Sequence, residues 1–257
     1  MRLGTWNILA GHSVTEDVED TIGAAVARLD LDVLGLNEVD YLQERSDFTD
    51  QTREAAAAMG AVDWRFGPSF RGEDRSRVSM RGTLFGPDDR PSGSHYGISL
   101  LSRVPVLRWH RTELGMSPIG LPLLSARHGE RSMRYVVDEP HLAIGAELAN
   151  GWVVVATHLS FVTPVAVAQL VRVRAWARRL GRKAGKRVAV IGDMNLARVI
   201  IPLRPQWQSP INANTYPSWQ PSVQLDHILV PLGVEATPLT LPSVGLSDHL
   251  PIAVDVH

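Results

Sequence analysis

Short apolar runs rich in β-branched residues limit this chain to a fold built mainly from β-sheet. Each run is closed by glycine, proline or polar residues, as buried strands are. The runs occupy residues 31–36, 97–101, 152–157, 188–191, 225–230 and 252–256. Helical spacing of apolar residues is found at residues 15–29, 50–59 and 163–180. Because strands outnumber helices, we expect a sheet-dominated α/β fold and not a doubly wound one.

The chain is expected to form one domain over residues 1–257, since no repeat, linker or shift in composition divides it. Residues 70–95 and 109–139 carry glycine, proline and charge with little periodicity, and we expect two long loops there. No apolar stretch reaches the length of a membrane span. The first residues lack the basic start and apolar core of a secretory signal. We therefore expect a cytoplasmic protein with no integral membrane association and no obligate protein partner.

Charge and cysteine content exclude several functional classes. The 26 lysines and arginines balance 27 acidic residues, so a strongly basic nucleic-acid-binding protein is not indicated. The absence of cysteine excludes disulfide scaffolds, cysteine nucleophiles and zinc–thiolate sites. Residues 172–187 contain only basic charges, which would suit nucleic acid or phospholipid. Most of these charges lie off the apolar stripe of the expected helix, so a solvated helix face is the favoured interpretation.

Polar side chains stand at one end of nearly every expected strand. They follow the early strands, including one at residues 2–7, and they precede the last two. The set comprises Asn7, Asn37, Glu38, His158, Asp193, Asn195, Asp226, Asp248 and His249. If the last two strands run antiparallel to the earlier ones, all of these side chains fall on the same rim of the sheets.

Such a rim fits the chemistry of phosphate esters. Carboxylates and carboxamides without thiolates are hard ligands that suit Mg²⁺ or Mn²⁺. An imidazole beside a carboxylate is fixed for proton transfer or charge stabilisation. Each residue alone has an ordinary structural explanation as a turn, a cap or a surface ion pair. Their joint occurrence indicates metal-assisted hydrolysis.

Seven segments, taken in order, resemble the endonuclease/exonuclease/phosphatase superfamily of the deoxyribonuclease I-like fold. They read TWNILAG, LDVLGLNEVD, YGISLLSRVP, VVVATHLS, VAVIGDMNLA, TYPSWQPSVQLDHILV and LSDHLPIAVDV, and they span residues 5–256. The superfamily includes pancreatic deoxyribonuclease, apurinic endonucleases, neutral sphingomyelinases and inositol polyphosphate 5-phosphatases. Glu44-Arg45-Ser46 followed by Asp50-Gln51 resembles a bacterial branch of it.

The resemblance implies the fold and the metal site. The fold would be a four-layer α/β/β/α sandwich, in which two mixed β-sheets pack face to face with helices outside. Glu38 would be the main ligand of Mg²⁺ or Mn²⁺. Asn7 would hold the metal or its water, and Asp248 would lie on the metal side.

The resemblance also implies the catalytic residues. His249 would contact the scissile phosphate as part of a dyad with Asp226. Asp193 would orient or deprotonate the attacking water. Asn195 and His158 would donate hydrogen bonds to the phosphoryl oxygens as charge develops. Either Asp193 or His249 would be the general base.

Two positions depart from the pattern of many relatives. Leu9 stands where several nucleases carry an acidic residue, which favours a site with one metal. Asn37 stands where relatives often have glutamine, and its shorter amide is expected to serve in the same place.

The resemblance leaves three functions open. A phosphodiesterase of the nuclease type is placed first, ahead of a phosphoesterase for lipids or small molecules. A non-catalytic member that binds a phosphorylated ligand or a protein is the third. Some arginines and aromatic residues are candidate contacts for an anionic substrate or for a base, sugar or headgroup. They are Arg71, Arg75, Arg77, Arg81, Arg90, Trp207, Tyr216 and Trp219.

Overall fold

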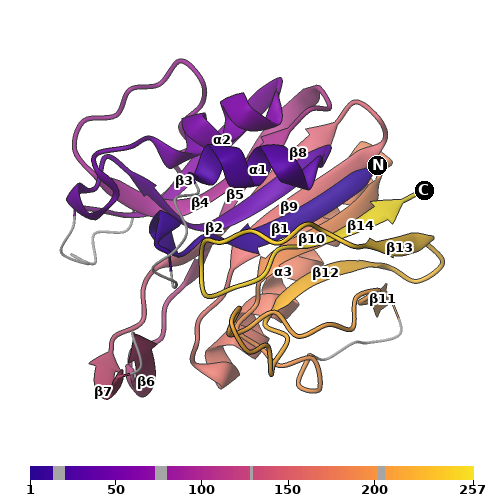
Figure 1. The fold of residues 1–257 in the computed structure, drawn as a ribbon. Helices are drawn as coiled ribbons and strands as arrows, with labels where there is room; N and C mark the ends of the chain where they lie inside the picture. The colour runs from indigo at the N-terminus through magenta and orange to yellow at the C-terminus, as the bar shows by residue number, and fades with distance from the viewer. Residues whose placement is uncertain (14–20, 73–79, 128–129, 202–205) are drawn as a thin grey trace.

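Two six-stranded mixed sheets pack face to face in the computed structural model (Figure 1). The structure describes residues 1–13, 21–72, 80–127, 130–201 and 206–257. The first sheet has the order β13-β14-β1-β2-β4-β3. Its strands are β1 (Arg2–Asn7), β2 (Val33–Tyr41), β3 (Asp63–Arg71), β4 (His95–Ser102), β13 (Ala236–Leu239) and β14 (Ile252–Val256).

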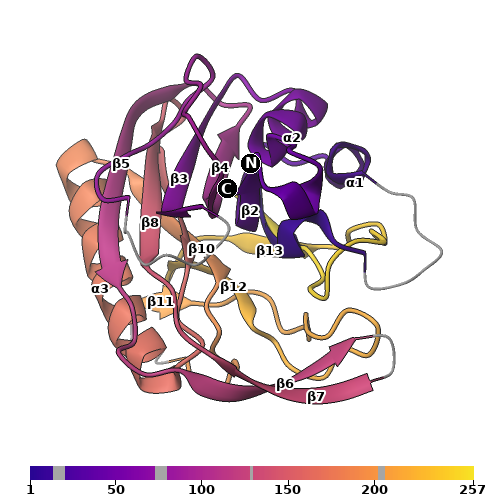
Figure 2. The same ribbon diagram turned by 90° about the vertical axis from the view of Figure 1, so that its left-hand side faces the viewer.

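The second sheet has the order β11-β12-β10-β9-β8-β5. Its strands are β5 (Val106–Gly115), β8 (His141–Leu148), β9 (Trp152–His158), β10 (Arg187–Asp193), β11 (Trp207–Gln208) and β12 (Asp226–Pro231). A separate hairpin of β6 (Leu121–Arg127) and β7 (Glu130–Val136) extends away from the sandwich (Figure 2).

Within the described residues, three α-helices cover the outer faces of the sheets. Helices α1 (Ile22–Leu29) and α2 (Gln51–Met59) pack on the first sheet through one apolar cluster that contains Trp6 and Leu34. Helix α3 (Thr163–Ala184) packs on the second sheet through another. A third cluster fills the space between the sheets. The result is the four-layer α/β/β/α sandwich that the sequence predicted, and Figure 2 shows α3 and the α1–α2 pair on opposite sides.

The alternation of side chains along the strands explains why the polar residues face one another. Along β1, Leu3 packs between the sheets, whereas Trp6 packs under the helices. Along β10, Ile191 packs between the sheets, whereas Val190 packs against α3. Because the side-chain period of a strand is two, the inner face continues to Asn7 at the end of β1 and to Asp193 at the end of β10.

Strand directions place the polar ends on one rim. β1 and β2 run parallel, as do β9 and β10. β12 runs antiparallel to β10, and β14 runs antiparallel to β1. The polar residues that precede β14 and open β12 therefore lie beside those that end the parallel strands.

Two of the expected loops contain strands. Residues 109–139 include most of β5 and the whole β6–β7 hairpin, so the prediction of a loop there was wrong. β5 is an edge strand with many half-exposed polar residues, and it therefore carries no apolar run. Residues 70–95 include the end of β3 and the first residue of β4, and Phe85 forms a bridge with Phe66.

The three expected helices are present with shifted ends. α1 begins at Ile22, after Thr21, whose hydroxyl accepts a hydrogen bond from Ala24 N. The earlier part of the expected helix, residues 15–20, lies outside the described residues. α3 continues past residue 180 to Ala184 and ends at Gly185 in the left-handed conformation. In the part of the chain that is described, no helix combines the length and apolar character needed to span a membrane.

Gly192 is required by the contact between β10 and β9. An added Cβ would lie 1.8 Å from the Thr157 carbonyl oxygen, and the φ of Gly192 is +147°. We expect Gly192→Ala to reduce the free energy of unfolding by about 3 kcal/mol, measured by urea denaturation. Gly233→Ala is the matched control, because it also has positive φ but no atom within 4 Å of its Cβ position. It should lose only about 1 kcal/mol. Equal losses in the two variants would contradict the steric explanation.

Candidate active site

Asn7 links two carboxylates that come from different sheets. Its Nδ2 donates to Glu38 Oε1 at 2.9 Å and to Asp193 Oδ2 at 3.0 Å. Its Oδ1 accepts a hydrogen bond from Leu9 N at 3.0 Å, which fixes the orientation of the amide. The structure thus brings Asn7, Glu38 and Asp193 together, with Asn7 positioning both carboxylates.

Unusual backbone conformations aim two of the site residues. Glu38 has φ of +54° and lies at a register shift between Leu36 and Val39 in the β2–β4 pairing. Asn195 has φ of +49°. Bulges and left-handed residues are uncommon and concentrate at functional sites, where the surrounding fold holds them in place. Here the bulge turns the Glu38 carboxylate toward Asn7.

Asn37 forms hydrogen bonds between the two sheets beside the site. Its Nδ2 donates to the Thr157 carbonyl oxygen at 3.0 Å, and its Oδ1 accepts from Asp193 N at 2.9 Å. Asn37 is fully buried. The shorter amide at this position therefore reaches across the interface and holds the backbone of Asp193.

His249 and Asp226 form a buried pair. Asp226 Oδ2 lies 2.7 Å from His249 Nδ1, and the His249 carbonyl oxygen accepts from Trp6 Nε1 at 3.0 Å. The Tyr216 ring lies 4.9 Å from the imidazole, centre to centre. Burial opposes a charged His249, but Asp226 and Asp193 outweigh it and raise the pKa of His249 to about 10. The pair therefore presents an imidazolium whose Nε2 faces Asp193 Oδ2 at 3.8 Å.

His158 faces the same carboxylate from the neighbouring parallel strand β9. Its Nε2 lies 3.7 Å from Asp193 Oδ2 and 3.2 Å from Asn195 Nδ2. Asn195 N donates to Asp193 Oδ1 at 2.8 Å, and Asn195 Nδ2 also donates to the Leu159 carbonyl oxygen at 2.8 Å. Asp193 is thus the common neighbour of both imidazoles.

Asp248 lies close enough to Glu38 for the two charges to interact. Burial, and to a smaller extent the charge of Glu38, raise the pKa of Asp248 to about 6. Asp248 Oδ1 is buried and has no hydrogen-bond partner among the described residues. A buried carboxylate oxygen without a partner, beside a second carboxylate, is what a divalent cation would complete. The residues present therefore fit a divalent cation, which Glu38 and Asp248 would hold.

A second grouping of possible ligands suits a metal less well. Asp193, Asp226 and His249 bring one ligand atom each to within 4.8 Å of one another. The imidazole in this grouping already interacts with both carboxylates, and its raised pKa keeps it protonated. A protonated imidazole has no free lone pair for a metal, so this group is the poorer candidate for a metal site.

Glu139 belongs to the site but was not predicted. Its Oε1 lies 3.9 Å from His158 Nδ1, on the side of the ring that faces away from Asp193. The sequence signal is the acidic pair Asp138-Glu139 shortly before His141, the first residue of β8. It is similar to the predicted pair Asp248-His249, which stands a few residues before β14. Glu139 was missed because the preceding residues were interpreted as a loop.

The other candidate substrate contacts lie in several different places, and Tyr216 is the one that reaches the site among those described below. Tyr216 lies at the site beside His249, whereas Trp207 is buried in the cluster under α3 and Trp219 is half exposed. Arg90 donates to the carbonyl oxygens of its own loop. Arg75 and Arg77 lie outside the described residues.

The basic stretch of α3 covers the outer face of the second sheet. Arg172 donates to the carbonyl oxygens of Leu114 and Glu113 in β5, at 3.0 and 3.1 Å. Arg179 and Lys183 lie beside Glu147 of β8. Arg179 and Lys183 thus lie along the outer face of the sheet, whereas Arg172 contacts the end of β5 that pairs with the start of β8.

Comparison with solved structures supports the fold. A mannosyl-6-phosphatase from Bacteroides thetaiotaomicron superposes with a TM-score of 0.60 at 12% identity, covering 100% of this chain and 99% of that one. The human Nocturnin catalytic domain superposes with a TM-score of 0.57 at 16% identity, covering 100% of this chain and 93% of that one. A protein of the endonuclease/exonuclease/phosphatase family from Beutenbergia cavernae superposes with a TM-score of 0.60 at 20% identity, covering 99% of this chain and 70% of that one. At these identities the likeness shows a common fold.

Comparison with sequence families is more specific. No curated protein matches this chain. The model of one family matches residues 4–249, which include every predicted site residue from Asn7 to His249. The chain therefore belongs to the Endonuclease/Exonuclease/phosphatase family.

Proposed function

We propose that this protein is a divalent-metal-dependent phosphodiesterase of the nuclease type, acting by in-line attack of water on a phosphate ester. The observation that carries the proposal is the contact of Asn7 with both Glu38 and Asp193. This contact supports the proposal because one amide bridges Glu38, the proposed metal ligand, and Asp193, the proposed water-orienting carboxylate. The buried Asp226–His249 pair adds a cationic donor to the same space.

Glu38 and Asp248 would hold Mg²⁺ or Mn²⁺, which when bound supplies positive charge to the phosphoryl oxygens. Asp193 orients the attacking water through its Oδ2, which lies 3.7 Å from His158 Nε2 and 3.8 Å from His249 Nε2. His249 donates from Nε2 to the phosphoryl group, and Asp226 stabilises the positive charge on its ring. His158 and Asn195 contact the remaining oxygens and strengthen these contacts as charge develops.

The test is hydrolysis by the purified protein with Mg²⁺, with Mn²⁺ or with EDTA. The substrates are plasmid DNA, a duplex with an abasic site, RNA, an aryl phosphodiester, an aryl phosphomonoester and a choline phospholipid. We expect metal-dependent cleavage of nucleic acid and of the aryl diester, lost in EDTA and in His249→Ala. Turnover of only the monoester or the phospholipid would reject the nuclease assignment in favour of a phosphatase or lipid phosphoesterase. No turnover of any substrate would favour a non-catalytic binding protein.

A further inference from the structure

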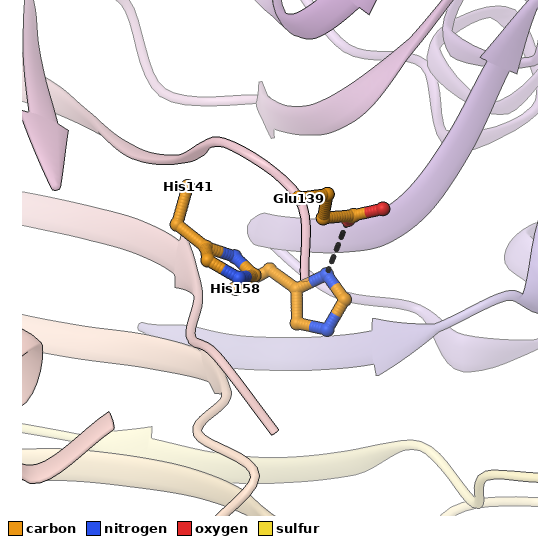
Figure 3. Close-up of side chains that lie close together, drawn as sticks. All are labelled: Glu139, His141 and His158. Carbon is orange, nitrogen blue, oxygen red and sulfur yellow. Dashed lines mark ion pairs between the residues drawn. The ribbon is translucent and has the colours of Figure 1, made fainter. Parts of the chain in front are cut away.

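Three side chains behind His158 form a second cluster of possible metal ligands. Glu139, His141 and His158 bring one ligand atom each to within 4.8 Å of one another (Figure 3). The cluster exists because β8 runs antiparallel to β9, so that the start of β8 lies beside the end of β9. The His141 and His158 rings meet edge to face, with their centres 5.5 Å apart.

The chemistry of this cluster differs from that of the Glu38–Asp248 site. Two imidazoles and one carboxylate suit Zn²⁺ and related transition-metal ions, whereas Mg²⁺ prefers oxygen ligands. The side chains are enclosed: His141 is 3% exposed, His158 11% and Glu139 13%.

A buried second layer orients His141. Asp138 Oδ1 lies 3.0 Å from His141 Nε2, and Asp138 Oδ2 accepts from Ser160 Oγ at 2.8 Å and from Ser117 N. A carboxylate that accepts from one imidazole nitrogen leaves the other nitrogen of the ring as a metal ligand.

His158 connects this cluster with the active site. Its Nδ1 faces Glu139, while its Nε2 faces Asp193 and Asn195. An ion held on the Nδ1 side leaves Nε2 as the nitrogen that carries hydrogen, which is the form that donates to a phosphoryl oxygen. In this form Nε2 would donate toward Asp193 Oδ2 or a phosphoryl oxygen, and Asn195 Nδ2 would donate to the Leu159 carbonyl oxygen alone.

We propose that Glu139, His141 and His158 form a binding site for a transition-metal ion of the Zn²⁺ class, separate from the oxygen-ligand site at Glu38. The proposal does not depend on the substrate of the enzyme. Its test therefore measures metal binding and not turnover.

The experiment titrates the full chain with Co²⁺, a spectroscopic substitute for Zn²⁺, in excess Mg²⁺ that fills the oxygen-ligand site. We expect a visible absorption band that saturates at a single Co²⁺ and disappears when Zn²⁺ is added. His141→Asn should weaken this binding by at least about 100-fold. His110→Asn is the matched control and should bind normally, because His110 pairs with Glu147 on β5 and β8, outside the cluster. Glu38→Gln should also bind Co²⁺ normally.

X-ray absorption of the Zn²⁺-loaded wild-type protein gives a second measurement that does not depend on how the variants fold. We expect two imidazole ligands and at least one oxygen ligand. Undiminished Co²⁺ binding in His141→Asn would overturn the proposal. So would Co²⁺ binding that is lost in Glu38→Gln, or a Zn²⁺ shell without imidazoles. None of these results would count against the proposed hydrolase function, which is tested separately by turnover.

Discussion

Glu38→Gln is expected to abolish Mg²⁺ and Mn²⁺ binding and to lower kcat for phosphate-ester hydrolysis by at least about 10³-fold. Glutamine keeps an oxygen that can accept from Asn7 Nδ2, which now lies 2.9 Å from Glu38 Oε1, so the fold should be preserved. The charge that holds the metal is lost. Loss of this charge also removes one of the influences that raise the pKa of Asp248. Calorimetric titration with Mg²⁺ and steady-state kinetics measure the two effects.

Glu147→Gln is the control for this variant. Glu147 Oε1 lies 2.6 Å from His110 Nε2 on the second sheet, away from the site. Loss of its charge should leave the affinity for metal and kcat within about twofold of the wild-type values. If Glu38→Gln retained metal binding or near-normal turnover, the assignment of Glu38 as the principal ligand would be wrong.

Asp193→Asn is expected to lower kcat by about 10³-fold with little change in KM. Asparagine can still accept from Asn195 N through one oxygen, as Asp193 Oδ1 does at 2.8 Å. Its amide nitrogen would then face Asn7 Nδ2, which now donates to Asp193 Oδ2 at 3.0 Å. The variant therefore loses the negative charge that orients water. It also loses the hydrogen bond from Asn7 Nδ2 that holds the side chain at position 193 in place.

Asp255→Asn is the matched substitution outside the site. Asp255 Oδ1 lies 2.8 Å from the amino terminus at the edge of β14, and its replacement should leave kcat unchanged. An increase in KM with normal kcat in Asp193→Asn would show that Asp193 binds substrate without taking part in the chemical step.

The rim of polar residues could be predicted because it follows from strand periodicity and from the order of the segments. The apolar runs identify the strands, and each polar residue directly adjoins one of them. Relative strand direction was an assumption, and the pairing of β12 with β10 confirmed it. The four-layer fold came from the resemblance and was confirmed as well.

Other features depend on long-range contacts that leave no local signal. The left-handed φ of Glu38 arises from the register shift between β2 and β4, which no stretch of β2 specifies alone. Strand β5 is half exposed along most of its length, so its sequence resembles a loop. Glu139 reaches the site only because β8 starts where β9 ends.

The bond from Trp6 to the His249 carbonyl oxygen joins residues 243 positions apart, and it has a consequence for folding. During synthesis, the polar end of β1 can contact His249 only after nearly all of the chain has been made. Contacts of such separation slow folding, because the intervening chain must be ordered first. A chain stopped before β14 can form neither the last strand of the first sheet nor the active site. Recovery of activity after refolding should therefore coincide with completion of the whole sandwich and should not precede it.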